Sequence, residues 1–286
     1  RYLITNAPFE LNHTIESVKI IEPSSPMPTQ VTLYGSVTEQ AALLPEISNP
    51  TVKRIYCMAI TDPTSGFNDG QPSSWSAAVD KISAEGKKRL FIISGGNVEE
   101  GELKTSGYPN ACLNKSIEDP AQAWNALTVG AYSIDSTIQP GRETKGYYPV
   151  AQYGELSPYS STSNEWKTQW PIKPEVVCDG GNVASDGTNF IQGMDELSKL
   201  TLSKDINRRL FDTIWATSAA TAQCSYIAAE LMAAYPSMRP ETLRALIVHS
   251  ARWTTQMINQ FGVPDTKYKG RKNYLGLVDT ESLILK

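Results

Sequence analysis

The apolar positions of this chain fall into short continuous runs separated by segments with helical spacing. Runs of strand length occupy residues 52–60, 89–93, 126–131 and 174–178. Strands that are apolar on both faces are typical of a parallel sheet covered by helices. The pattern therefore predicts an α/β fold with three layers, in which helices cover both faces of a mostly parallel sheet.

Segments with helical spacing lie between these runs and after them. Helices are expected at residues 34–47, 75–84, 195–209, 219–234 and 240–249. Ser73 or Ser74 stands where the second of these helices needs a cap. Pro240 occupies the first position of the last helix, where proline is favoured.

Two further segments complete the expected organisation. A short strand is expected at residues 16–22, and the polar segment 186–214 is typical of an insertion that carries the helix at 195–209. No internal repeat or low-complexity linker divides the chain. One domain over residues 1–286 is the simplest organisation.

The helix expected at 219–234 is the centre of the chain. It is dense in Ala, has no internal Gly or Pro, and ends before Pro236. Its apolar positions recur at helical spacing, at Ala222, Tyr226, Ala229 and Ala233. A helix that is apolar over most of its circumference is usually buried. Thr217 and Ser218 precede it, and either one is placed to be its N-cap.

Composition and charge exclude several classes of partner. Hydrophobic residues make up 40% and charged residues 20% of the 286 residues, which is ordinary for a globular protein. The net charge of −4 gives no reason to expect a nucleic acid or an anionic membrane surface as a partner. No apolar run approaches the ~20 residues that a membrane-spanning helix needs.

The cysteines are scattered along the chain as Cys57, Cys112, Cys178 and Cys224, without the paired spacing of a zinc site. Cys57 and Cys224 lie in apolar segments and are interpreted as small buried hydrophobic residues. Reduced thiols are favoured, which points toward a cytoplasmic location. Neither a metal nor a cofactor is expected.

Two short segments, Ala-Thr-Ser-Ala-Ala at 216–220 and Gly-Gly-Asn at 95–97, carry a resemblance to a known family. They resemble motifs of the subtilisin-like serine peptidases. The family carries Gly-Thr-Ser-Met-Ala at the start of a long buried helix, and this chain has Ala-Thr-Ser-Ala-Ala at 216–220. The family's Ala-Gly-Asn at the end of a strand is similar to Gly-Gly-Asn at 95–97. Further similar segments follow in the family's order, at 125–133, 156–161, 173–177, 239–251 and 274–279. The resemblance covers about residues 50–286 and implies a subtilisin-like fold whose N-terminal part is incomplete.

The resemblance implies a role for each matching residue. Ser218 would be the nucleophile of a serine endopeptidase, and Asn97 together with the backbone N–H of Ser218 would stabilise the oxyanion. A polypeptide substrate would lie between two segments that follow neighbouring strands. These segments comprise Met58, Ala59, Ile60 and Thr61 on one side, and Ser94, Gly95 and Gly96 on the other.

Three departures from the family pattern stand out. Ala216 replaces the glycine before Thr-Ser, and the proline that closes the family's serine motif has no equivalent. The family's Asp-Thr/Ser-Gly and His-Gly-Thr motifs are both absent. His13 and His249, the two histidines, are interpreted as structural or surface residues. We therefore expect the parent protein to supply Asp and His upstream of Arg1, and this chain to be inactive or nearly so by itself.

Other interpretations compete with the peptidase. The substitution at Ala216 is compatible with a non-catalytic member of the family that binds peptides or other partners. Asn97 alone could be a turn residue with left-handed φ. Nucleotide binding at Gly95-Gly96 is discounted because the full glycine pattern is missing, and an α/β-hydrolase esterase because Ser218 has no flanking glycines. The loop at 66–70 is expected to be a surface turn rather than a calcium site.

Overall fold

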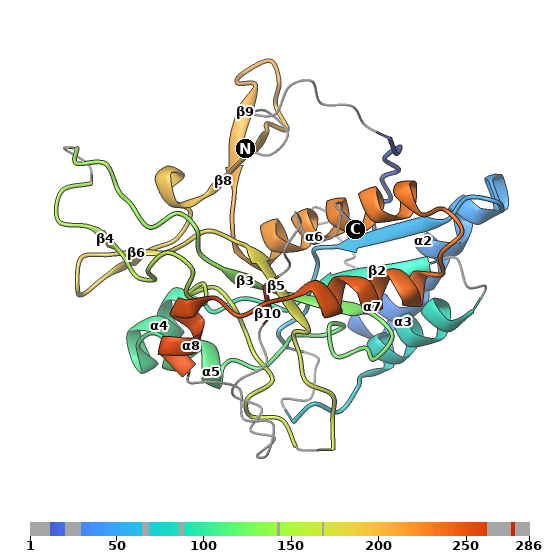
Figure 1. The fold of residues 1–286 in the computed structure, drawn as a ribbon, viewed down its shortest axis with the longest axis horizontal. Helices are drawn as coiled ribbons and strands as arrows, with labels where there is room; N and C mark the ends of the chain where they lie inside the picture. The colour runs from blue at the N-terminus through green and yellow to red at the C-terminus, as the bar shows by residue number, and fades with distance from the viewer. Residues whose placement is uncertain are drawn as a thin grey trace.

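The computed structural model describes residues 12–20, 30–64, 69–85, 89–141, 144–167, 169–261 and 276–277. Its centre is a parallel sheet with the strand order β1-β2-β3-β5-β10 (Figure 1). These strands are β1 Arg54–Met58, β2 Arg89–Ser94, β3 Leu127–Tyr132, β5 Val176–Asp179 and β10 Gly276–Leu277. The parallel sheet expected from the apolar runs is therefore present. Only 276–277 of the segment 274–279 lie within the described residues.

Helices and short strands surround this sheet. The helices are η1 Val31–Leu33, α2 Tyr34–Ser48, α3 Ser74–Ala84, α4 Glu100–Ser106, α5 Asn110–Asn114, η2 Asp195–Leu197, α6 Ala216–Ala234, α7 Pro240–Ser250 and α8 Thr255–Phe261. The remaining strands are β4 Tyr148–Pro149, β6 Ala184–Ser185, β7 Phe190–Ile191, β8 Lys199–Leu202 and β9 Phe211–Ile214. Among the described helices, none is long and apolar enough to cross a membrane.

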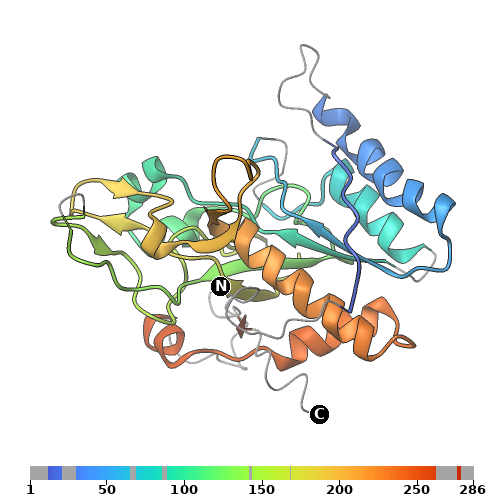
Figure 2. The same ribbon diagram turned by 90° about the horizontal axis from the view of Figure 1, so that it is seen from above.

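The sheet buries different side chains on its two faces, as strand β2 illustrates. Leu90 and Ile92 pack in the core cluster that contains the apolar residues of α6 and α7. Phe91 and Ile93 point to the opposite face and pack in the cluster that contains residues of α2 and α3. Figure 2 shows these two helix pairs on opposite sides of the sheet. The three-layer α/β architecture is confirmed.

Local signals marked several helix boundaries correctly. The Ser73 hydroxyl accepts a hydrogen bond from the backbone N–H of Ser76 at 2.9 Å, so Ser73 is the N-cap of α3. Pro240 is the first residue of α7, a position whose backbone N–H has no partner within the helix.

The helix expected at 195–209 is wrong. Only the short η2 forms there, and strands β8 and β9 follow as an antiparallel hairpin that projects from the body (Figure 1). The segment Lys199–Leu202 reads Lys-Leu-Thr-Leu, so polar side chains alternate with leucines, which is typical of a strand. The Ser203 hydroxyl then accepts from the backbone N–H of Asp205 at 3.1 Å, which favours a turn over continued helix.

Two smaller expectations also need correction. Residues 16–20 of the strand expected at 16–22 form no strand, and the other two lie outside the described residues. Glu16 instead forms an ion pair with Arg54 at 2.7 Å. Cys57 is exposed rather than buried, whereas Cys224 is buried as expected. The four cysteines form no disulfide with one another.

A buried ion cluster fixes the projecting hairpin to the sheet. The ammonium group of Lys199, on β8, forms ion pairs with both Asp179 and Asp135. Asp179 also accepts a hydrogen bond from the backbone N–H of Gly181 at 3.1 Å. Burial raises the pKa of Asp179, and the Lys199 ammonium counteracts that shift. The lysine therefore compensates a carboxylate that is 5% exposed at the end of β5.

We expect Lys199→Met to destabilise the protein by about 3–5 kcal/mol, because it leaves buried carboxylates without their cation. Urea unfolding followed by circular dichroism would measure the loss. The matched control is Lys204→Met on the same hairpin, at an exposed position, with an expected change within ~0.5 kcal/mol. Equal stability of the two variants would contradict the assignment of Lys199 as the anchor.

Candidate active site

The start of helix α6 lies against the carboxyl ends of strands β2 and β5. The backbone N–H of Ala216 donates to the carbonyl oxygen of Gly180, the residue after β5, at 2.8 Å. A Cβ atom at position 180 would lie 2.5 Å from the Ala131 Cβ and 2.8 Å from the Ala216 oxygen. Glycine at 180 therefore allows the sheet and the helix start to approach this closely.

Asn97, which follows β2, holds the next residue of the helix. Its side-chain oxygen accepts from the backbone N–H of Thr217 at 3.1 Å and from the Thr217 hydroxyl at 2.7 Å. The same hydroxyl lies 3.2 Å from the carbonyl oxygen of Gly96. Because both Thr217 groups are donors, they fix the oxygen of the Asn97 amide, and its Nδ2 group points away from them. Among the described residues, Nδ2 donates no hydrogen bond.

Ser218 is the residue that follows this contact, and it is half-buried in the first turn of α6. Within the described part of the chain, neither its hydroxyl nor its backbone N–H has a hydrogen-bond partner. Backbone N–H groups in the first turn have no partner inside the helix, and the helix dipole favours negative charge there. The structure thus brings Asn97 and Ser218 to the same helix end, each with a donor available.

The interpretation of Thr217 or Ser218 as an N-cap is wrong. Helix α6 begins at Ala216, and Trp215 is its N-cap residue without a side-chain cap. Tertiary contacts replace the side-chain cap: the backbone N–H of Ala216 donates to the carbonyl oxygen of Gly180, and that of Thr217 donates to the Asn97 side chain. The helix therefore starts ahead of the expected residue 219.

Backbone conformation distinguishes Ala216 from Asn97. Ala216 has φ 65°, and it is the one non-glycine residue with positive φ among the described residues. The left-handed conformation expected for a simple turn lies at Gly96, with φ 103°, and not at Asn97. The turn interpretation of Asn97 therefore does not hold. The methyl group at 216 sits where glycine would be unstrained.

The two histidines lie away from Ser218. His13 is 3.4 Å from the carboxylate of Glu230. Glu230 comes three turns of α6 after Ser218, about 18 Å along the helix axis. His249 is exposed in the last turn of α7. Among the described residues, neither histidine forms a hydrogen bond with Ser218.

The segments expected to flank a substrate lie beside each other, since β1 and β2 are neighbouring parallel strands. Met58 is buried at the end of β1, Ala59 is exposed, and Ile60 and Thr61 are half-buried. Ser94, Gly95 and Gly96 are all buried at the end of β2.

Glu118, which no sequence motif indicated, joins these two segments. Its carboxylate accepts from the Thr61 hydroxyl at 2.5 Å, and a Cβ at position 96 would lie 2.5 Å from its Cγ. Burial raises its pKa, against the lowering effects of Thr61 and Lys115. No local pattern marks Glu118, because it lies in a loop far from both segments in the sequence.

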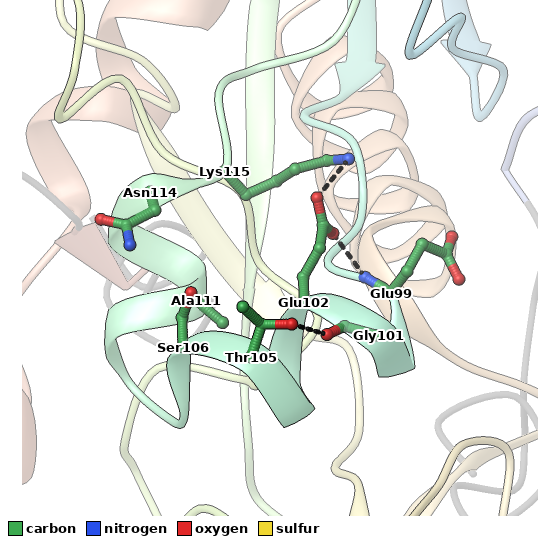
Figure 3. A pocket seen from close by; sticks show the side chains of 8 residues that line it. All are labelled: Glu99, Gly101, Glu102, Thr105, Ser106, Ala111, Asn114 and Lys115. Atoms are coloured by element: carbon green, nitrogen blue, oxygen red, sulfur yellow. Dashed lines mark hydrogen bonds and ion pairs between the residues drawn. The ribbon is translucent and has the colours of Figure 1, made fainter.

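Two hollows lie elsewhere on the described surface. One, of about 520 Å³, is lined by residues of α4 and α5 and their surroundings (Figure 3). The other, of about 780 Å³, lies between the loop after β3 and the β8–β9 hairpin. Neither is lined by Ser218 or Asn97. The described residues contain no cluster of three or more His, Cys, Asp or Glu side chains that could hold a metal ion.

Comparison with known proteins identifies the class. The model of the subtilase family of peptidases matches residues 3–277, so this chain belongs to the subtilase family. The resemblance carried by the serine and asparagine motifs is thereby confirmed.

Its individual relatives are distant. The uncharacterized protein y4bN of Sinorhizobium fredii is 26% identical over 246 residues, which cover 80% of this chain and 55% of that protein. This chain thus spans about half the length of that curated relative. Among solved structures, sphericase is 21% identical with a TM-score of 0.44, covering 76% of this chain and 54% of the other. A cold adapted subtilisin-like serine proteinase is 15% identical with a TM-score of 0.48, covering 86% and 61%.

We expect Ala216→Gly to stabilise the protein by about 1 kcal/mol, because it removes the Cβ from a left-handed conformation. Ala222→Gly is the matched control, since Ala222 is exposed within the same helix and should lose about 1 kcal/mol in helix propensity. Urea unfolding measures the free energy of unfolding of both variants, which should rise for Ala216→Gly and fall for Ala222→Gly. Destabilisation by both substitutions would show that Ala216 is not strained.

Proposed function

We propose that this chain is part of a serine endopeptidase in which Ser218 is the nucleophile. The observation that carries the proposal is the Thr217–Asn97 contact, because it fixes the amide oxygen of Asn97 on the residue before Ser218. The amide Nδ2 and the backbone N–H of Ser218 are then two donors at one helix start. Two such donors suit the negative charge that develops on a carbonyl oxygen under attack.

The reaction follows from these groups. The Ser218 hydroxyl oxygen bonds to the carbonyl carbon of the substrate while its proton passes to a base, and the two donors stabilise the resulting oxyanion. The same base then returns the proton to the leaving amine, so that an acyl-enzyme remains. A water molecule then attacks the carbonyl carbon of the acyl-enzyme by the same two steps. This releases the carboxylic acid and restores the Ser218 hydroxyl.

The base in this proposal is a histidine oriented by an aspartate, both upstream of Arg1 in the parent protein. The assignment is supported by the contacts of the two histidines, because within the described residues neither His13 nor His249 is hydrogen-bonded to Ser218. A serine hydroxyl without a base is a weak nucleophile at neutral pH. We therefore propose that this chain by itself is inactive or nearly so.

A peptide-binding member without catalysis is the second candidate. The strained Ala216 favours it, because the substitution adds a methyl group and backbone strain beside the nucleophile position. The two candidates differ in the reactivity of Ser218. A fluorophosphonate forms a covalent bond with an activated serine and leaves an unactivated serine unmodified.

In the full-length parent protein, we expect Ser218→Ala to reduce the cleavage of an unstructured polypeptide to background and to abolish fluorophosphonate labelling. Asn97→Ala should lower kcat about 10²–10³-fold with a smaller effect on KM, because its amide acts on the transition state. Fluorogenic peptide assays and gel detection of the probe measure both effects.

Ser225→Ala is the matched control for these variants. Ser225 lies on the same helix, and its hydroxyl donates to the carbonyl oxygen of Thr221 at 2.8 Å, away from the helix start. We expect it to retain turnover and labelling. Absence of both from the unmutated parent protein would reject the enzyme and favour the binding module.

A further inference from the structure

Glu118 and Asp119 link the two segments proposed to flank the substrate. The backbone N–H of Glu118 donates to the carbonyl oxygen of Gly95 at 2.9 Å. The backbone N–H of Asp62 donates to the carbonyl oxygen of Asp119 at 2.8 Å. Residues 118–119 therefore bridge the chain after β1 to the chain after β2. We call this arrangement the Glu118 junction.

The carboxylate of Glu118 lies inside this junction and is 9% exposed. It accepts from the Thr61 hydroxyl at 2.5 Å, and the backbone N–H of Asn97 acts to lower its pKa. A Cβ at position 96 would lie 2.8 Å from its Oε2 atom. The carboxylate therefore takes the space that a side chain at Gly96 would fill, directly before the proposed oxyanion residue.

The negative charge of Glu118 is only partly compensated. Lys115 Nζ lies 3.5 Å from the Glu118 carboxylate and 3.1 Å from that of Glu102. Figure 3 shows the Lys115 side chain extended toward Glu102 on α4. Among the described residues, Lys115 is the one cation that forms an ion pair with Glu118, and it also forms an ion pair with Glu102.

Neighbouring groups at the junction are acidic as well. Asp62 pairs through its backbone with Asp119, whose carboxylate is 2% exposed and accepts from the hydroxyls of Ser73 and Ser76. A poorly hydrated carboxylate that shares its cation favours a further cation within ion-pair distance. The position of Lys115 shows that an ammonium group can reach Glu118.

We propose that Glu118 makes this protease select substrates with a lysine or arginine immediately before the scissile bond. The inference rests on the proposed function, because it places the substrate between the Thr61 and Gly96 segments. A substrate side chain directed between those segments meets the Glu118 carboxylate. The incoming cation exchanges with the Thr61 hydroxyl or with Lys115, so that the carboxylate remains paired throughout.

The experiment uses the full-length protein and two fluorogenic peptides that differ only in lysine or methionine before the scissile bond. These side chains have similar length, so charge is the main difference. We expect kcat/KM to favour the lysine peptide by at least roughly tenfold. Glu118→Gln should remove that preference by lowering kcat/KM for the lysine peptide about tenfold, while the methionine peptide changes about twofold or less.

Glu100→Gln is the matched control, because it removes a carboxylate of α4 that pairs with Lys104 and leaves both Lys115 and the Glu118 junction intact. It should retain the lysine preference. No preference in the unmodified protein, or an equal loss on both peptides in Glu118→Gln, would show that Glu118 only braces the two segments. Either result would overturn the inference while the peptidase itself stands.

A binding measurement separates failure of this inference from failure of catalysis. Fluorescence titration with p-aminobenzamidine, a small aromatic cation, is performed on the full-length Ser218→Ala variant. We expect Glu118→Gln in that background to weaken binding at least roughly tenfold and Glu100→Gln to leave it unchanged. Glu118-dependent binding without turnover of either peptide would reject the nucleophile and support the cation site. Equal binding by all variants would reject the cation site.

Discussion

The hydrogen bonds between Thr217 and the Asn97 side-chain oxygen are the contact on which the rest of the site depends. The first turn of any helix has unpaired N–H groups, and here the end of β2 accepts from one of them while Gly180 accepts from another. The residues that follow the carboxyl ends of strands β2 and β5 therefore determine where α6 starts. They also leave the backbone N–H and hydroxyl of Ser218 unbonded among the described residues, beside the free donor of Asn97.

This arrangement carries a cost at Ala216, the residue that turns the chain into the helix with φ 65°. A left-handed conformation is unfavourable for alanine by about 1–2 kcal/mol, and it persists where surrounding contacts determine it. Those contacts are present, since Gly180 allows close approach and its carbonyl oxygen holds the Ala216 N–H. Local strain next to a candidate nucleophile is compatible with function, but it also sustains the non-catalytic alternative.

Two buried carboxylates lie near the ends of the strands, in different electrostatic settings. Asp179 is paired with Lys199, and together with Asp135 they attach the β8–β9 hairpin to the end of β5. Glu118 lies between the segments that follow β1 and β2, and its lysine is closer to Glu102. The first carboxylate thus has a structural role in anchoring the hairpin. The second remains available to a cation, which is why we assign it to substrate selection.

The sequence by itself determined the parallel sheet, the layers of helices, the Pro240 start of α7 and the family, because apolar periodicity, helix-start residues and short motifs are local signals. It predicted a buried α6 but not which side faces the sheet, since an Ala-rich helix has no distinct polar face: Ala220, Cys224 and Leu231 are buried, whereas Ala222 is exposed. Only the tertiary structure decided the first residue of α6, the hairpin at 199–214, the exposure of Cys57 and the position of Glu118. Each of these depends on contacts between residues distant in the sequence, and no local pattern encodes such contacts.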